Sequence, residues 1–177
     1  EGRARRSGQG LNADLGYTLP GVVATPRVHV GYEYLSGDNK NSSKYEGWDP
    51  VLGRWARFSE IIAYEAAGET GIPAHYTNLQ RFTLGADCKP VKGMVVSADY
   101  SYLLANSHTF GRAPGANPAF FNEGNGRGSL VVGNLLYEFN KYVCGQLRGE
   151  WFHPDDYYGP QADQAWFLRW ELVFKLL

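Results

Sequence analysis

Ionisable side chains recur at every second position in several segments of the sequence, and they are the residues most able to do chemistry. In 165–177, Arg169 and Glu171 alternate with Leu168 and Trp170. Successive side chains of a β-strand point to opposite faces, so this spacing places the charges on one face and the apolar residues on the other. Charged groups along one wall could pair with one another, hydrate a channel and select solutes by charge.

This charged face is the candidate functional site. The residues expected to line a lumen and set its selectivity are Arg27, His29, Glu33, Arg81, Asp87, Asp99, Glu138, Arg148, Glu150, Arg169, Glu171 and Lys175. We expect opposite charges among them to pair across neighbouring strands. Such pairs could hold the wall together, and the same wall could line a hydrated conduit, so the two interpretations are compatible.

Other arrangements of reactive residues carry little signal. The GNGRG stretch at 124–128 lacks the Lys-Ser/Thr of a phosphate-binding loop, and the histidines lack metal-ligand spacing. We therefore expect no catalytic residues, no cofactor and no metal. Catalytic triads assemble in space, so a membrane-embedded lipase stays open as the enzymatic alternative. Cys88 and Cys144 are expected on non-neighbouring strands and on opposite faces, which disfavours a disulfide.

The strands that must position these charges follow from the same alternation. The pattern predicts strands at 10–19, 27–36, 79–89, 93–105, 130–140, 142–152 and 165–177. No charged residue falls on the apolar face of any of them. Strands of this length fit the roughly 9–11 residues that cross hydrocarbon at a tilt. A soluble sandwich or barrel would also alternate, so the pattern alone leaves the direction of the apolar face open.

The connections between the predicted strands favour a membrane barrel. Short connections at 20–26, 90–92 and 140–141 alternate with longer ones at 37–78, 106–129 and 153–164. In an antiparallel meander, this alternation gathers all long loops at one end, as in bacterial outer-membrane barrels. Aromatic residues also concentrate at the strand ends, which is typical of the two girdles at the bilayer interfaces.

Composition sets further limits. The chain has 177 residues and a formal net charge of −1, which fits one domain and argues against a nucleic-acid partner. No apolar run is long enough for a transmembrane helix, and the first residues lack the apolar core of a signal peptide. We interpret 1–9 as a basic lead-in on the outer side and 10–177 as C-terminal barrel strands. Since bacterial barrels have an even strand number, at least one upstream strand is expected.

One long loop contains a helical pattern. Segment 58–67, FSEIIAYEAA, has helical spacing, and Gly68 is placed to end the helix. The segment could fold into the lumen as a constriction, cap the mouth, or be an ordinary surface loop. Arg54 and Arg57 lie beside it and are candidate constriction charges.

Several stretches resemble the alginate-export family of outer-membrane β-barrels. They are GYEYLSGDN (31–39), WDPVLGRWARFSE (48–60), ETGIPAHYTNLQRFTLGADCKP (69–90) and SADYSYLLAN (97–106), while 10–21, 137–158 and 167–177 are similar to the family's terminal strands. The resemblance implies a barrel of about 18 strands that passes anionic polysaccharide through a charged lumen. Two features depart from the family pattern: the chain ends on Leu176-Leu177 without a terminal aromatic residue, and its lumen charges are mixed where an alginate conduit would be arginine-rich.

The expected function is therefore transport. The sequence predicts an outer-membrane porin or exporter of a Gram-negative-type bacterium, passively conducting anionic polysaccharide or small polar solutes. Its expected partners are outer-membrane lipid and the solute, with partner proteins at the outer loops or in the periplasm as further candidates. The alternatives are a barrel with a plugged lumen, which binds a partner through 37–78 and 106–129, and a soluble ligand-binding barrel.

Overall fold

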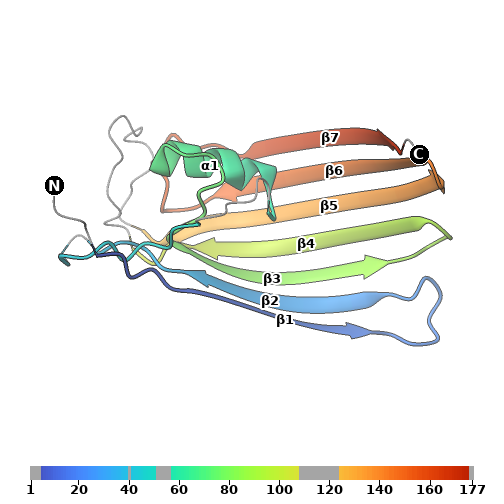
Figure 1. The fold of residues 1–177 in the computed structure, drawn as a ribbon, viewed down its shortest axis with the longest axis horizontal. Coiled ribbons are helices and arrows are strands. Elements are labelled where there is room, and N and C mark those ends of the chain that lie inside the picture. The colour runs from blue at the N-terminus through green and yellow to red at the C-terminus, as the bar shows by residue number, and fades with distance from the viewer. Residues whose placement is uncertain (1–4, 40, 51–56, 108–123, 176–177) are drawn as a thin grey trace.

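The chain forms one sheet of antiparallel strands with a helix over part of one face (Figure 1). The computed structural model describes residues 5–39, 41–50, 57–107 and 124–175. The strands, in sequential order across the sheet, are β1 (Gly10–Thr18), β2 (Arg27–Leu35), β3 (Leu79–Cys88), β4 (Met94–Leu104), β5 (Gly126–Asn140), β6 (Val143–Pro154) and β7 (Ala165–Phe174). The helix is α1 (Glu60–Thr70). The predicted all-β, up-and-down architecture is confirmed.

Strand boundaries agree with the alternation to within two residues except at two ends. Strand β5 begins at Gly126, four residues before the predicted start, and β7 ends at Phe174. The early start of β5 was hidden because its first residues include Gly126 and Gly128, which are typical of loops. In the structure, Gly128 takes a φ of +120° and pairs with Pro154 of β6.

Helix α1 lies slightly further along the chain than predicted. Ser59 is its N-cap, with the Ile62 N–H donating to the Ser59 hydroxyl oxygen at 3.1 Å. The helix runs through Gly68, which was expected to end it. It ends instead at Gly71, whose left-handed φ of +79° is adopted most easily by a residue without a Cβ.

The connections sort by length between the two ends of the sheet. Residues 19–26, 89–93 and 141–142 form the turns at one end, which we call the short-turn end. Residues 36–78, 105–125 and 155–164 connect the strands at the other end, the long-loop end, where α1 also lies (Figure 1). The predicted sidedness of the loops is confirmed.

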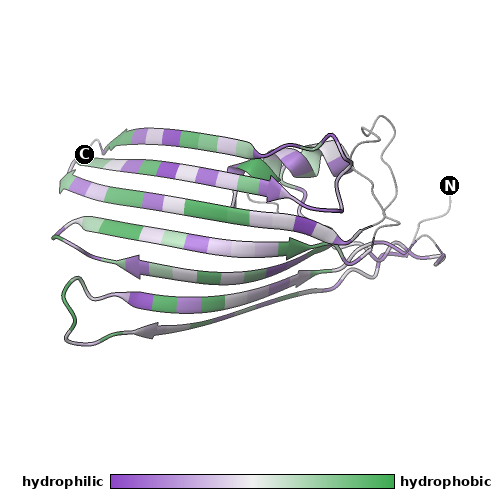
Figure 2. Cartoon of the chain, turned by 180° about the vertical axis from the view of Figure 1, so that it is seen from behind, coloured by the Kyte–Doolittle hydropathy of each residue, from purple (hydrophilic) through white to green (hydrophobic). Residues whose placement is uncertain are grey.

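The two faces of the sheet differ as the alternation predicted. On the face opposite α1, the outer face, Trp166, Leu168 and Trp170 have exposed fractions of 76%, 74% and 70%. Apolar residues of the other strands, such as Leu15 and Leu84, are exposed on the same face. Apolar and polar bands alternate along the strands in Figure 2. The opposite, inner face carries the charges and α1.

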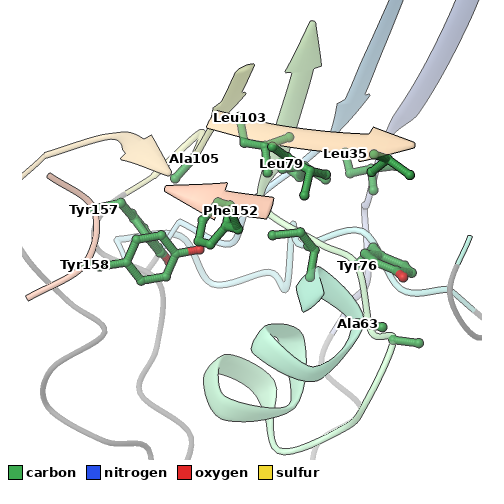
Figure 3. Close-up of a cluster of buried hydrophobic side chains, with 13 residues drawn as sticks. Leu35, Ala63, Tyr76, Leu79, Leu103, Ala105, Phe152, Tyr157 and Tyr158 are labelled. Carbon is green, nitrogen blue, oxygen red and sulfur yellow. The ribbon is translucent and has the colours of Figure 1, made fainter. Parts of the chain in front are cut away.

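The core lies between α1 and the long-loop end of the inner face. Ile62 and Ala63 of α1 join a buried cluster with Leu103, Leu130 and Phe152 of the sheet (Figure 3). These strand residues form an apolar patch on the inner face where α1 covers it. No helix within the described residues is long and apolar enough to cross a membrane.

Candidate functional site on the inner face

The predicted site residues follow the strand alternation onto the inner face. They are Arg27, His29 and Glu33 of β2, Arg81 and Asp87 of β3, Asp99 of β4, Glu138 of β5, Arg148 and Glu150 of β6, and Arg169 and Glu171 of β7, with Lys175 just after β7. Their pairing divides them into a long-loop half, which holds α1, and a short-turn half away from it. Their role in lining a lumen stays a prediction.

Glu150 holds the N-terminus of α1. Its side chain is buried, and its Oε2 accepts a 2.6 Å hydrogen bond from the Ser59 hydroxyl. The backbone N–H groups of Glu60 and Ile61 also donate to its carboxylate, at 3.0 and 3.2 Å. The first N–H groups of a helix lack partners within the helix and carry partial positive charge, so they favour a carboxylate at this position. Glu150 therefore fixes where α1 starts against the sheet.

Two arginines complete this anchor. Arg148 Nε donates to Glu150 Oε1 at 2.6 Å, and its Nη2 donates to the Phe58 carbonyl oxygen at 2.6 Å. Arg169 pairs with Glu60 at the first position of α1. Strands β6 and β7 thus hold the helix start from two sides.

The expected pairing of opposite charges across β6 and β7 is wrong. The register places Arg148 directly opposite Arg169, while Glu150 lies opposite Phe167. The ion pairs form along each strand instead, Arg148 with Glu150 and Arg169 with Glu171 at 3.1 Å. The register follows the apolar pattern of the outer face, and the two arginines tolerate each other because each has its own acceptors.

Glu33 is a second anchor for the segment that leads into α1. It is 1% exposed and pairs with both Arg57 and Arg81, the latter at 3.2 Å. The Arg81 guanidinium also lies 4.5 Å from the centre of the Phe58 ring, a cation–π distance. Arg57 thus has a carboxylate partner on the sheet. Arg54, the other expected constriction charge, lies outside the described residues.

Arg127 is a site residue that the sequence reasoning missed. It lies near the start of β5, is 2% exposed, and pairs with Glu69 at 2.7 Å and Glu65 at 3.0 Å, both on α1. Tyr157 donates its hydroxyl to Glu69 at 2.6 Å. Burial raises the pKa of Glu65 to about 7, with Glu69 adding to the rise and Arg127 opposing it. The C-terminal half of α1 is therefore tied to β5.

The short-turn half contains charge pairs away from α1. Arg27 lies between Asp14 at 3.2 Å and Asp87 at 3.4 Å, on three neighbouring strands. His29 Nε2 lies 2.9 Å from Asp99 Oδ1. Here opposite charges do pair between strands, as expected. Cys88 and Cys144 are free thiols.

These groups can bind and guide polar solutes, and the described residues contain no His/Cys/Asp/Glu group suited to hold a metal ion. A comparison with curated proteins finds no match to the chain. A family model described as "Alginate export" matches residues 1–166. The chain belongs to the alginate-export family of outer-membrane transport proteins.

Proposed function

We propose that this chain forms part of the wall of an outer-membrane conduit through which anionic polysaccharide or small polar solutes diffuse passively. The observation that carries the proposal is the two-faced sheet. Its outer face exposes leucine, valine and tryptophan side chains, while its inner face bears the charges and buries Glu33 and Glu150 under a folded loop. A lipid-facing exterior and a hydrated interior account for this division.

The edges of the sheet support closure into a larger barrel. Among the described strands, β1 pairs only with β2 and β7 only with β6. An unpaired backbone group in hydrocarbon costs several kcal/mol, so both edges need further strands as partners. A barrel of about 18 strands, in the outer membrane of a Gram-negative-type bacterium, supplies them.

Helix α1 and the segment before it would narrow the conduit at the long-loop end. Contacts of α1 with the sheet involve mainly β6 and β7, and Glu33, Glu150 and Arg127 tie the segment to the inner face. Arg57 would then lie near the constriction, and its pairing with Glu33 would reduce the positive field that it contributes there. The lumen-lining residues in the short-turn half, such as Arg27 and Asp99, would meet the solute directly.

Planar-bilayer recording of the full-length protein tests this function. We expect stable single-channel steps, together with a reversal potential that shifts when inner-face charges are changed, because such charges set the selectivity of a water-filled pore. Asp99→Asn should shift the reversal potential toward anions. Asp163→Asn, in the connection between β6 and β7, is the matched control and should leave it unchanged. If the full-length protein inserted into the bilayer but showed no conductance, the proposed conduit function would be wrong.

A barrel with a plugged lumen is the second candidate function, and the anchoring of α1 favours it. Ion pairs hold both halves of α1 against the inner face: Arg169 pairs with Glu60 at its start, and buried Arg127 pairs with Glu69 near its end. A plug held this firmly would leave the long loops to bind a partner protein. Insertion without conductance, together with a stable complex that depends on 36–78, would support this candidate.

A further inference from the structure

Several connections at the long-loop end meet at one buried asparagine. Asn78, the residue before β3, is fully buried and has a left-handed φ of +51°. Asparagine is one of the few residues with a Cβ that adopts this conformation readily. Both the side chain and the backbone groups of Asn78 contact other connections.

The side chain of Asn78 holds the start of the connection from β4 to β5. Its Oδ1 accepts hydrogen bonds from the backbone N–H groups of Asn106 and Ser107, at 3.0 and 2.9 Å, and its Nδ2 donates to the Ser107 carbonyl oxygen at 2.7 Å. The Asn106 side chain in turn donates to the Leu35 carbonyl oxygen at 2.6 Å. A buried amide with three partners has one preferred position, so Asn106 and Ser107 are fixed against the end of the 36–78 connection.

The backbone of Asn78 joins this contact to α1. Its carbonyl oxygen accepts a 3.2 Å hydrogen bond from Arg127 Nη2, the same nitrogen that pairs with Glu69 of α1 at 2.7 Å. Its N–H donates to the Ser36 carbonyl oxygen at 3.1 Å. One residue therefore links α1 to the β4–β5 connection in the hydrogen-bond network.

Ser36, the first residue after β2, extends this network to the segment before β1. Its N–H donates to the Gln9 carbonyl oxygen at 2.9 Å, and the Gln9 N–H donates to its hydroxyl oxygen at 2.8 Å. The Ser36 hydroxyl also donates to the Glu46 carbonyl oxygen at 2.7 Å, and the Trp48 N–H donates to the Ser36 carbonyl oxygen at 2.9 Å. Ser36 and Asn78, which we call the junction, thus hold segments that are far apart in the sequence.

We propose that the junction couples α1 to the connections at the long-loop end, so that the constriction and the segments around it change position together. Its polar groups are buried and have their partners in different connections. Moving one connection alone leaves buried polar groups unpaired, which is costly, whereas moving the connections together keeps these bonds. For transport, the proposal rests on the conduit function proposed above: a coupled constriction opens in discrete steps and not through independent movements of single loops.

Gly37 allows the coupling to be tested from a neighbouring position. A Cβ built at Gly37 would clash with Asn78 Oδ1 and lie 2.9 Å from Asn78 Cγ. Gly37→Ala should therefore displace the Asn78 amide from its partners. Asn78→Gly removes the atoms that the added methyl group would meet, and glycine adopts the left-handed backbone without strain. The two substitutions thus form a double-mutant cycle.

Amide exchange of the detergent-solubilised full-length protein tests the coupling without depending on conductance. We expect Gly37→Ala and Asn78→Gly each to lower the protection factors of Asn106 and Ser107 about tenfold, because both remove buried hydrogen bonds. Protection of α1 should fall about two- to threefold, as expected for coupling through a network. The double variant should be no less protected than Asn78→Gly alone. Gly149→Ala, where the added Cβ meets no atom within 4 Å, is the matched control and should exchange like the native protein.

Two exchange results would overturn the coupling. One is a loss of protection confined to Asn106 and Ser107 in Asn78→Gly, with α1 protected as in the native protein. The other is additivity of Gly37→Ala and Asn78→Gly, which would mean that the methyl group at position 37 acts elsewhere.

Single-channel recording separates the coupling from the conduit. In a conducting protein, Asn78→Gly should add intermediate current levels, because the constriction is then released from the neighbouring connections. A conducting protein whose current levels are unchanged in Asn78→Gly keeps the conduit function and loses the coupling of its constriction. A protein without conductance that shows the expected exchange pattern loses the conduit function and keeps the coupling.

Discussion

The Ser59 hydroxyl donates a 2.6 Å hydrogen bond to Glu150 Oε2, joining the N-cap of α1 to the middle of the inner face. The residues are 91 positions apart, so the contact fixes a long loop against a strand near the other end of the chain. Glu150 serves as partner for the helix N-terminus and for Arg148 at once. Removing its charge therefore weakens two interactions together.

Glu150→Gln should loosen α1 from the sheet. The amide keeps the shape but provides only one acceptor oxygen and no charge, and it leaves Arg148 without its carboxylate, so we expect a loss of about 2–4 kcal/mol. Limited proteolysis of 57–78 and amide exchange of α1 should both accelerate. Asp163→Asn, which changes a charge at the same end of the sheet, should leave both rates unchanged. Equal protection in Glu150→Gln would show that the apolar cluster alone holds the helix.

Arg127 should be more costly to replace than any arginine of the short-turn half. Arg127→Met leaves Glu65 and Glu69 buried without their cation, for an expected loss of about 3–5 kcal/mol. Adding Glu69→Gln and Glu65→Gln should recover much of that loss, because the uncompensated charge is then gone. Urea unfolding of the reconstituted protein measures the difference. If the triple variant were as unstable as Arg127→Met, lost packing of the arginine would be the cause.

The stability of α1 should depend on pH through Glu65. Its pKa is raised from 4.5 to about 7 by burial. The folded arrangement therefore favours the protonated form, and the stability of α1 falls as the pH rises from about 4.5 to 7, then levels off. The amide protection factors of α1, which are corrected for the intrinsic pH dependence of exchange, should be higher at pH 5 than at pH 8. Glu65→Gln should flatten this dependence, and a profile that stays the same in Glu65→Gln would assign it to another group.

Leu168→Arg tests whether the outer face of the sheet contacts lipid. Leu168 is 74% exposed in the middle of β7. In a soluble protein an arginine at this exposed position would change the stability little. In a bilayer it should cost about 2–4 kcal/mol near the midplane. Gln146→Arg is the matched control, since it lies opposite Glu171 on the inner face. Folding into lipid vesicles can be monitored by heat-modifiable electrophoresis. It should fail or slow for Leu168→Arg and stay unchanged for Gln146→Arg.

The strands, their faces and the sidedness of the loops could be predicted because each depends on local patterns. Alternation within 165–177 already places Trp170 and Arg169 on opposite faces, and connection length follows from where the patterns stop. The partner of each charge could not be predicted. Arg148 lies opposite Arg169 because of the register, and its acceptor Phe58 is 90 positions away in the chain. Arg127 was hidden because flanking glycines are typical of loops.

Gly128, near the start of β5, provides a last prediction, about backbone strain. Gly128 has a φ of +120°, and a Cβ built there would lie 2.1 Å from the His153 carbonyl oxygen, which is backbone and cannot move easily. Gly128→Ala should therefore cost about 1–3 kcal/mol and displace Arg127 from α1. Gly133, on the same strand, is the matched control, because a Cβ added there meets no atom within 4 Å. Gly133→Ala should unfold in urea like the native protein, whereas Gly128→Ala should unfold earlier and lose protection of α1. Native-like protection in Gly128→Ala would mean that β5 can begin at Leu130 without releasing the helix.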